Sequence, residues 1–236
     1  ISADHEGIIE LPDDAPVGLS FSDFANKKDA IIDIAITPNR ADCLGVLGIA
    51  KDLAASGIGK IKLPEIEKIN GNFKSPISVD LQCPSSEEAI CSLFLSRYIK
   101  GVRNVESPSW LQERLEAIGL RPISAVVDIT NYLTFDCNRP VHAFDADRIK
   151  GNNLQVKLDS GDTSFKALND KSYILDNQMT VISDSEGVVS LAGVIGGERT
   201  ACTEETVNVF LEVALFDPVR TASTGRKLGI DSDARY

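Results

Sequence analysis

The sequence has few of the residues that metal sites and disulfide frameworks require. Its 236 residues include only two histidines, and none of the five cysteines forms a C-x-x-C pair. An odd number of isolated cysteines argues against a disulfide framework or a zinc ribbon, so we expect free thiols in a reducing cytoplasm. The five are Cys43, Cys83, Cys91, Cys137 and Cys202.

Positive charge and long apolar runs are scarce as well. The net charge is −11, with 24 Lys and Arg against 35 Asp and Glu. This balance disfavours a protein that holds nucleic acid by phosphate neutralisation alone, although the end of an RNA could still enter a pocket. No apolar run approaches the roughly 18 residues of a membrane span, so we expect no membrane partner. The first residue is Ile1, and we expect a piece of a longer polypeptide.

The residues that are present suit a globular chain with two parts. Residues 31–37 (IIDIAIT) are β-branched and predict a buried strand. Residues 42–55 have helical apolar spacing and end before Gly57, and residues 60–75 are a polar linker marked by proline and glycine. We therefore expect a small α/β segment with its linker over residues 1–72 and a second domain over residues 73–236.

The second domain changes character along its length. Strands are predicted at 77–81 and 93–99, and a helix begins at Ser107-Pro108 and ends at Gly119. From residue 153 helical periodicity disappears, and short β-rich runs follow at 154–158, 173–175, 180–183, 188–192 and 207–213. The predicted fold class is α+β, with a mixed α/β half packed against a β-rich half.

Two side chains could carry chemistry. His142 lies in RPVHAFD, where it is a hydrogen-bonded structural residue, a catalyst, or, with Asp145 and Asp147, a metal ligand that lacks a second histidine at ligand spacing. Glu212 interrupts the apolar run NVFLEVALF, where an unpaired charge is costly. It either has an internal partner or waits for a donor on a ligand. Because no nucleophile motif or Walker-type loop is present, Gly193, Gly196 and Gly197 are read as sites of close backbone approach.

Four stretches resemble the β subunits of bacterial-type phenylalanyl-tRNA synthetases. They are TPNRADCLGVLGIAKDLAA (37–55), GLRPISAVVDITNYL (119–133), RPVHAFDAD (139–147), and the run from LAGVIGGE through NVFLEVALFDP to TGRKLGIDSDARY (191–236). The resemblance implies the B3/B4 editing region with part of the adjacent B1 domain. It also implies hydrolysis of the ester of mischarged Tyr-tRNA(Phe), within an enzyme that ligates phenylalanine to tRNA.

The same resemblance implies site residues. His142, Thr130 and Asn131 correspond to the catalytic positions, and Glu212 corresponds to the acid that recognises the tyrosine hydroxyl. Gly196, Ser232 and Ala234 correspond to further substrate-binding positions, and no position corresponds to a metal ligand. The chain departs from the family where Asn138-Arg139 replaces the usual Gly-Gln, which puts the shape of the loop beside His142 in question.

Partners and cofactors are implied by the family too. The resemblance implies contact with the tRNA(Phe) 3′ end and with the α subunit of an α2β2 enzyme. No cofactor is implied for this region, because ATP and magnesium serve the whole enzyme and amino-acid activation belongs to the α subunit. The rival hypothesis is a non-catalytic structural module that binds RNA or a subunit. A deacylation assay separates the two.

Overall fold

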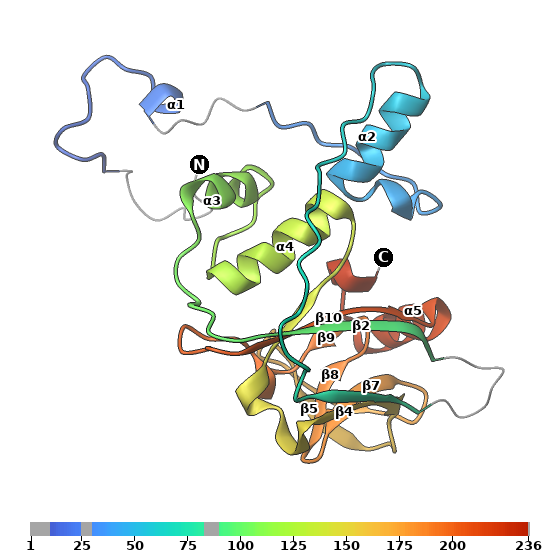
Figure 1. Cartoon of the computed structure of the whole chain (residues 1–236). Coiled ribbons are helices and arrows are strands. Elements are labelled where there is room, and N and C mark those ends of the chain that lie inside the picture. Colours follow the sequence, from blue (N-terminus) through green and yellow to red (C-terminus); the bar gives the residue numbers. More distant parts are fainter. Residues whose placement is uncertain (1–9, 25–29, 83–89, 236) are drawn as a thin grey trace. The chain divides into compact units, whose positions relative to one another are not determined.

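The structure is a computed structural model that describes residues 10–24, 30–82 and 90–235 (Figure 1). The chain divides into two compact units, Ile1–Ile34 and Ala35–Tyr236. The described part of the first unit carries the short helix α1, Phe21–Phe24. His5 and Cys83 lie outside the described residues. The domain boundary predicted near residue 72 stays a prediction.

The strand predicted over residues 31–37 is wrong. These residues have no regular structure, and Ile31 and Ile32 are 70% and 77% exposed. β-branched residues favour a strand only where a neighbouring strand and a buried face are available, and no strand of the described residues pairs with this run. Local propensity alone therefore did not decide its conformation.

The helix predicted over residues 42–55 is confirmed from Val46 to Ala55 and begins four residues later than expected. A 3₁₀ turn, η1 (Ala41–Cys43), leads into helix α2 (Val46–Ala55). The chain leaves α2 through Gly57, whose φ of +84° is the left-handed conformation that glycine accepts at a helix end. Residues 60–75 have no helix or strand, as the linker prediction requires.

The rest of the second unit contains three sheets. Five strands make a mixed sheet in the order β1-β4-β7-β8-β9, in which β1 and β4 are parallel. Three more make the antiparallel sheet β2-β10-β3, and β5 and β6 form a hairpin. The strands are β1 (Ser78–Leu81), β2 (Cys91–Ile99), β3 (His142–Asp145), β4 (Asn153–Leu158), β5 (Thr163–Lys166), β6 (Ser172–Leu175), β7 (Thr180–Asp184), β8 (Gly187–Leu191), β9 (Ile195–Gly196) and β10 (Val209–Phe216).

The main core lies between the two larger sheets. Leu154 and Val156 of β4 face this core from the five-stranded sheet, and Phe144 of β3 and Phe210 of β10 face it from the three-stranded sheet. All four are fully buried. Fully burying side chains of this kind contributes about 1.5–3 kcal/mol each, so this layer fixes how β3 and β10 lie against the larger sheet. The α+β class is confirmed.

Two helices precede β3. Helix α3 (Ser109–Ala117) begins one residue later than predicted, because Pro108 is its N-cap and Ser107 is not. The Ser107 hydroxyl instead donates to the buried carboxylate of Asp128 at 2.6 Å. Asp128 belongs to helix α4 (Ala125–Cys137), which the sequence pattern did not predict. The short 3₁₀ turns η2 (Ala146–Arg148), η3 (Lys150–Asn152), η4 (Glu198–Thr200) and η5 (Asp233–Arg235) complete the unit.

Helix α5 (Pro218–Leu228) contradicts the expectation that helices disappear after residue 153. Its ends carry clear signals: the Asp217 side chain accepts a hydrogen bond from the backbone N–H of Arg220, and Gly229 has a φ of +64°. Its buried positions are Thr221, Thr224 and Gly225. Since none of these is a large apolar residue, hydrophobic periodicity could not reveal the helix.

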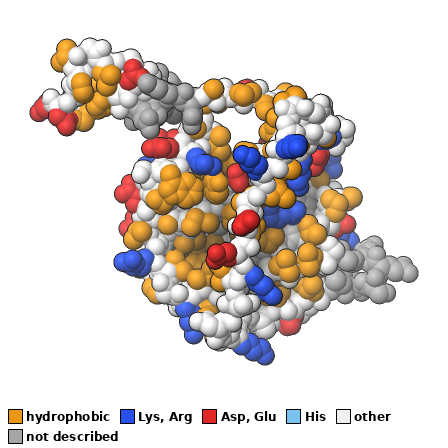
Figure 2. All heavy atoms as spheres, turned by 45° about the horizontal axis from the view of Figure 1, so that its top comes forward, with side chains coloured by type: hydrophobic (Ala, Val, Ile, Leu, Met, Phe, Trp, Pro, Cys, Tyr) orange, Lys and Arg blue, Asp and Glu red, His pale blue; other side chains and the backbone are white. Residues whose placement is uncertain are grey.

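Large hydrophobic side chains are exposed on the surface of the three-stranded sheet. Figure 2 shows such side chains gathered over a broad part of the face drawn there. On the three-stranded sheet, Leu93, Leu95 and Ile99 of β2 and Leu215 of β10 are exposed. Exposed apolar groups that gather on one face are typical of a surface that another protein layer covers.

The thiols give a first testable expectation. Cys43, Cys91, Cys137 and Cys202 are not joined in disulfides, and only Cys137 among these four is exposed. We expect a thiol reagent to label Cys137 first in the native protein and all five cysteines after denaturation without reductant, as mass spectrometry of the labelled peptides would record. Cys137→Ser should remove the fast reaction. A count below five that reduction restores would contradict the prediction.

Candidate functional site

A cavity of about 270 Å³ lies where one end of β3 and β10 meets the β8–β9 turn and the start of α5. This volume falls just below the range of about 300–1,000 Å³ that is usual for small-molecule sites, so it suits a single compact group. Its lining residues are Arg139, Pro140, Val141, His142, Ser190, Leu191, Gly193, Val194, Ile195, Gly196, Glu212, Ala214, Leu215, Phe216, Pro218, Thr221 and Ala234.

His142 begins β3, directly opposite Glu212 of β10. Its ring packs edge-on against Phe144, with the ring centroids 4.4 Å apart. The Nε2 atom is buried and has no hydrogen-bond partner in the part of the chain that the structure describes. Burial lowers the pKa of His142 to about 4, so the imidazole is neutral at physiological pH.

Glu212 lies in the middle of β10 with only 6% of its surface exposed. Its Oε2 atom is buried without a hydrogen-bond partner, and no ion pair joins Glu212 to another described residue. Burial raises the pKa of the carboxyl group to about 8. At neutral pH the side chain is therefore a neutral acid, with a hydroxyl that can donate and a carbonyl oxygen that can accept. Within residues 10–24, 30–82 and 90–235, Glu212 therefore has no internal ion-pair partner.

The two groups form an incomplete polar site. Directly opposed residues of an antiparallel pair point to the same face, so His142 and Glu212 both face the cavity. Buried polar atoms without partners are rare in folded proteins, and those that remain often belong to sites that a ligand completes. The unpaired polar atoms of both groups can therefore form hydrogen bonds with a ligand in the cavity.

Glycine residues allow close backbone approach at the wall of this cavity. A Cβ atom placed on Gly196 would lie 2.4 Å from Cε1 and 2.8 Å from Nε2 of His142, so the backbone of β9 and the imidazole are in direct contact. At Gly197 a Cβ would lie 2.6 Å from the carbonyl oxygen of Val189. These distances confirm the sequence-based interpretation of both glycines as positions of close approach. Gly193 has a φ of +67°, which the turn between β8 and β9 requires.

The predicted site residues fall into two groups. His142, Gly196, Glu212 and Ala234 all line the cavity. Thr130, Asn131 and Ser232 do not. The Thr130 hydroxyl donates to the carbonyl of Val127 in its own helix, and the Ser232 hydroxyl donates to the carbonyl of Val194 at 2.6 Å. The roles of these three residues stay predictions.

The structure adds Arg139 and Thr221 to the cavity lining, and sequence reasoning assigned neither to the site. Arg139 is exposed and is the only Lys or Arg in the lining. A signal for it existed in the sequence, because Arg139 is part of the departure from the family pattern beside Pro140. Thr221 carried no such signal, since it lies on the helix that periodicity did not reveal.

No group of three or more His, Cys, Asp or Glu side chains is placed to hold a metal within residues 10–24, 30–82 and 90–235. The two acids considered as metal ligands have other partners. Asp145 accepts hydrogen bonds from Thr206 and from the backbone of Asp147, and Asp147 accepts from Asn208. His142 is therefore not part of a metal-binding cluster with them.

The part of the chain that contains this cavity matches a known domain family. The B3/4 domain family matches residues 90–236, which contain every lining residue of the cavity. The chain belongs to the B3/4 domain family. It is similar to the phenylalanine–tRNA ligase beta subunit of Rhodopseudomonas palustris, with 52% identity over 236 residues, and to that of Ruegeria pomeroyi, with 54% identity over 241 residues.

These two relatives are longer proteins. The alignments cover 100% of this chain but only 29% and 30% of the relatives' lengths. The resemblance to β subunits of phenylalanyl-tRNA synthetases is confirmed at this level. An N-terminal fragment of the phenylalanyl-tRNA synthetase β-subunit from Pyrococcus horikoshii matches 81% of this chain and 59% of that chain, at 20% identity and a TM-score of 0.42. In the described part of this B3/4 chain, no helix is long and apolar enough to cross a membrane.

Proposed function

We propose that this B3/4 cavity hydrolyses the ester that joins tyrosine to the 3′ end of tRNA(Phe). One observation carries the proposal: Glu212 and His142 face the same cavity with buried polar atoms that have no partner among the described residues. A tyrosine side chain is apolar except for one hydroxyl. Such a group suits a compact cavity whose apolar wall includes Leu191, Val194 and Phe216.

Selection of tyrosine over phenylalanine follows from hydrogen bonding. A hydrophobic synthetic site discriminates only about a hundredfold against an isostere that adds one hydroxyl, whereas a site built to bind that hydroxyl rejects the analogue without it far more strongly. The carbonyl oxygen of the neutral Glu212 side chain accepts a hydrogen bond from the tyrosine hydroxyl. Phenylalanine would leave the buried acid without a partner, at a cost of about 1–3 kcal/mol.

The chemistry needs positioning more than a strong base. The imidazole of His142 is neutral, and no serine or cysteine in the cavity lining pairs with it as a nucleophile. We assign the attack to a water held beside the ester, with His142 in contact with the substrate and the terminal ribose hydroxyl assisting. Gly196 and Ala234 would shape the binding wall, and the resemblance to the family is the sole support for assigning Thr130, Asn131 and Ser232 to the site.

The wider assignment is that this region belongs to a phenylalanine–tRNA ligase, a cytoplasmic α2β2 enzyme in which ATP and magnesium serve amino-acid activation. The exposed apolar residues of the three-stranded sheet support a covering partner, such as the α subunit or another part of the β subunit. Arg139 is the cation available to the tRNA phosphates at the cavity, and most RNA affinity would come from the rest of the assembly.

The deciding experiment measures deacylation of Tyr-tRNA(Phe) by the α2β2 enzyme that contains this chain. Glu212→Ala removes the acceptor, so we expect tyrosyl-ester hydrolysis to fall at least about tenfold, the equivalent of about 1.4 kcal/mol. Glu212→Gln keeps a carbonyl acceptor and should lose less activity than Glu212→Ala.

Phenylalanine charging is the control for folding and assembly. Suppose that Glu212→Ala still charges phenylalanine and has the same ratio of tyrosyl to phenylalanyl hydrolysis as wild type. Glu212 would then have no part in recognising tyrosine. Absence of any deacylation by the wild-type enzyme would favour the non-catalytic binding module.

A further inference from the structure

Residues 37–55 do not line the cavity, but they contact the segment of chain that runs into its wall. The link is Asn138, the C-cap of α4, which adopts the left-handed conformation with φ 53° and ψ 44°. Its side-chain Nδ2 donates to the carbonyl oxygen of Ala41 in η1, with a distance of 2.6 Å across 97 positions of sequence. Glycine would satisfy the left-handed backbone equally well, so the amide serves the contact with η1 and not the turn.

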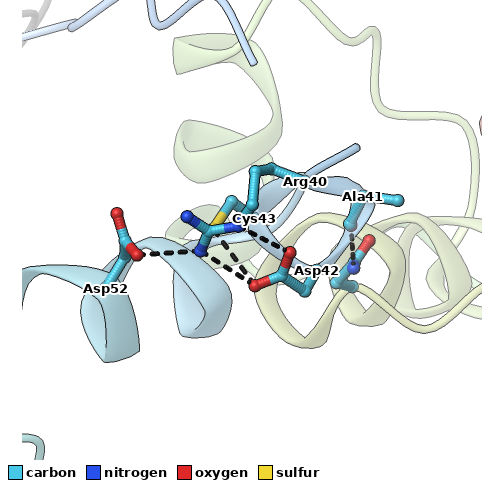
Figure 3. Close-up of polar contacts among 6 residues, drawn as sticks. Arg40, Ala41, Asp42, Cys43 and Asp52 are labelled. Carbon is cyan, nitrogen blue, oxygen red and sulfur yellow. Dashed lines mark hydrogen bonds and ion pairs between the residues drawn. The ribbon is translucent and has the colours of Figure 1, made fainter. Parts of the chain in front are cut away.

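The partner of Asn138 is a corner with many internal contacts (Figure 3). The guanidinium of Arg40 binds Asp42 through two hydrogen bonds of 3.0 Å and reaches Asp52 of α2 at 2.8 Å. It also donates to Cys43 Sγ. Hydrogen bonds from Arg40 lower the pKa of Asp42 to about 2, so Asp42 stays ionised across the physiological range. The corner therefore presents the Ala41 carbonyl in a fixed direction.

Gly45 brings this corner into backbone contact with the end of α4. A Cβ on Gly45 would lie 2.7 Å from the backbone nitrogen of Asn138 and 2.9 Å from the carbonyl oxygen of Phe135. Real side chains do not tolerate such distances to backbone atoms. The contact thus depends on glycine and holds Asn138 from a second side, independently of the amide hydrogen bond.

The residues directly after Asn138 form one wall of the cavity. Residues 139–142 are four consecutive lining residues, and the last of them is His142. Pro140 restricts the backbone between Asn138 and the histidine, so a change at Asn138 is transmitted along a short and stiff connection. Beyond His142 the chain is fixed by pairing with β10.

We propose that the η1–α2 corner is a positioning element for the editing cavity, and that Asn138 is its positioning residue. Asn138 contacts no substrate; it sets where the Arg139–Pro140–Val141 wall stands and how the imidazole of His142 faces Glu212. The consequence for catalysis rests on the proposed function, whereas the effect on His142 does not. Residues 37–55 thereby gain a role in the chemistry of a cavity that they do not line.

The test uses proton NMR of the full 236-residue chain, which has only two histidines. His142→Ala assigns the imidazole signals. Asn138→Gly keeps the left-handed turn and removes the amide, and Asn138→Asp keeps the shape but cannot donate to Ala41. Gly45→Ala disturbs the same contact while residue 138 stays asparagine with its amide group. Gly59→Ala is the matched control, because a Cβ there meets nothing within 4 Å.

We expect the His142 signal to shift in Asn138→Gly, Asn138→Asp and Gly45→Ala and to stay in place in Gly59→Ala. We also expect tyrosyl-ester hydrolysis at saturating substrate to fall about tenfold in the first three variants, as a small misplacement of a reacting group produces. A His142 signal that is unchanged in both Asn138→Gly and Gly45→Ala overturns the proposal. If wild type hydrolyses no tyrosyl ester, the proposed function fails, and the His142 signal still decides whether the corner positions the wall.

Discussion

Replacing Glu212 with glutamine should stabilise the protein at pH 8, by at least about 2 kcal/mol. Burial raises the pKa of Glu212 from 4.5 to about 8. Between these two values the unfolded chain carries an ionised carboxylate while the folded chain keeps the proton. A shift of one pKa unit corresponds to about 1.4 kcal/mol, so the upper limit of the effect at pH 8 is about 5 kcal/mol. The amide is not a perfect substitute for the acid, which reduces the gain.

The sign of the effect depends on pH. Because the folded pKa of Glu212 is raised, its contribution to stability is complete below pH 4.5 and is lost as pH rises toward 8. His142 behaves oppositely: its pKa is lowered from 6.5 to about 4, so its contribution is present above pH 6.5 and is lost as pH falls through 4. Wild type and Glu212→Gln both contain His142, so the contribution of His142 cancels, to first order, in the difference between their stabilities.

Thermal unfolding of wild type and Glu212→Gln at pH 4, 6 and 8 measures this difference. We expect a Tm gain of at least about 4 °C at pH 8, since about 2–4 °C corresponds to 1 kcal/mol for a domain of this size. The gain should disappear near pH 4. Glu205→Gln, at an exposed position, is the matched control. An equal gain at pH 4 and pH 8 would mean that packing, and not ionisation, explains it.

Such a gain would mean that the fold keeps an acid where an amide would be more stable. A strongly shifted pKa in a cavity is a common mark of a functional group, because selection for activity holds the group in an unfavourable environment. The stability measurement needs no tRNA, so it tests the state of Glu212 independently of the proposed reaction.

Sequence reasoning found the parts of the site that carry a local signal. Glu212 was conspicuous because an acid interrupts an apolar strand, and Gly196 because two glycines adjoin in a β-rich run. The opposition of His142 and Glu212 was not visible, because the two residues are 70 positions apart and only the register of β3 and β10 aligns their side chains. The resemblance to a known family named both residues without providing their geometry.

The errors have physical causes as well. Residues 31–37 have strong strand propensity but no strand partner among the described residues. Helix α5 was missed because small and hydroxyl side chains form its buried face. Ser107 looked like a helix cap, but its hydroxyl stabilises more by bonding the buried carboxylate of Asp128, which would otherwise have one partner fewer. Only at Ser107 did a contact with a distant residue override a local preference; the other two errors arose from a missing strand partner and from a buried helix face without large apolar side chains.

The largest loss of activity is expected from Gly196→Ala. The added methyl group would lie 2.4 Å from His142 Cε1 and 2.9 Å from Leu168 Cδ1. The imidazole cannot retreat freely, because its ring also packs edge-on against Phe144. It must turn into the cavity or push β9 away. Either movement displaces groups by about 1 Å, a misplacement that can cost about a hundredfold in rate.

Deacylation of Tyr-tRNA(Phe) by Gly196→Ala should therefore fall about a hundredfold, while phenylalanine charging stays near the wild-type level. Overpacking of this kind also destabilises by about 1–3 kcal/mol. Gly59→Ala again serves as the control, since its Cβ has open space. The double variant Gly196→Ala/His142→Ala identifies the cause: removing the imidazole removes the clash, so the Tm penalty of Gly196→Ala should shrink in the His142→Ala background. A penalty of the same size in both backgrounds would show that the contact between Gly196 and His142 does not limit the cavity.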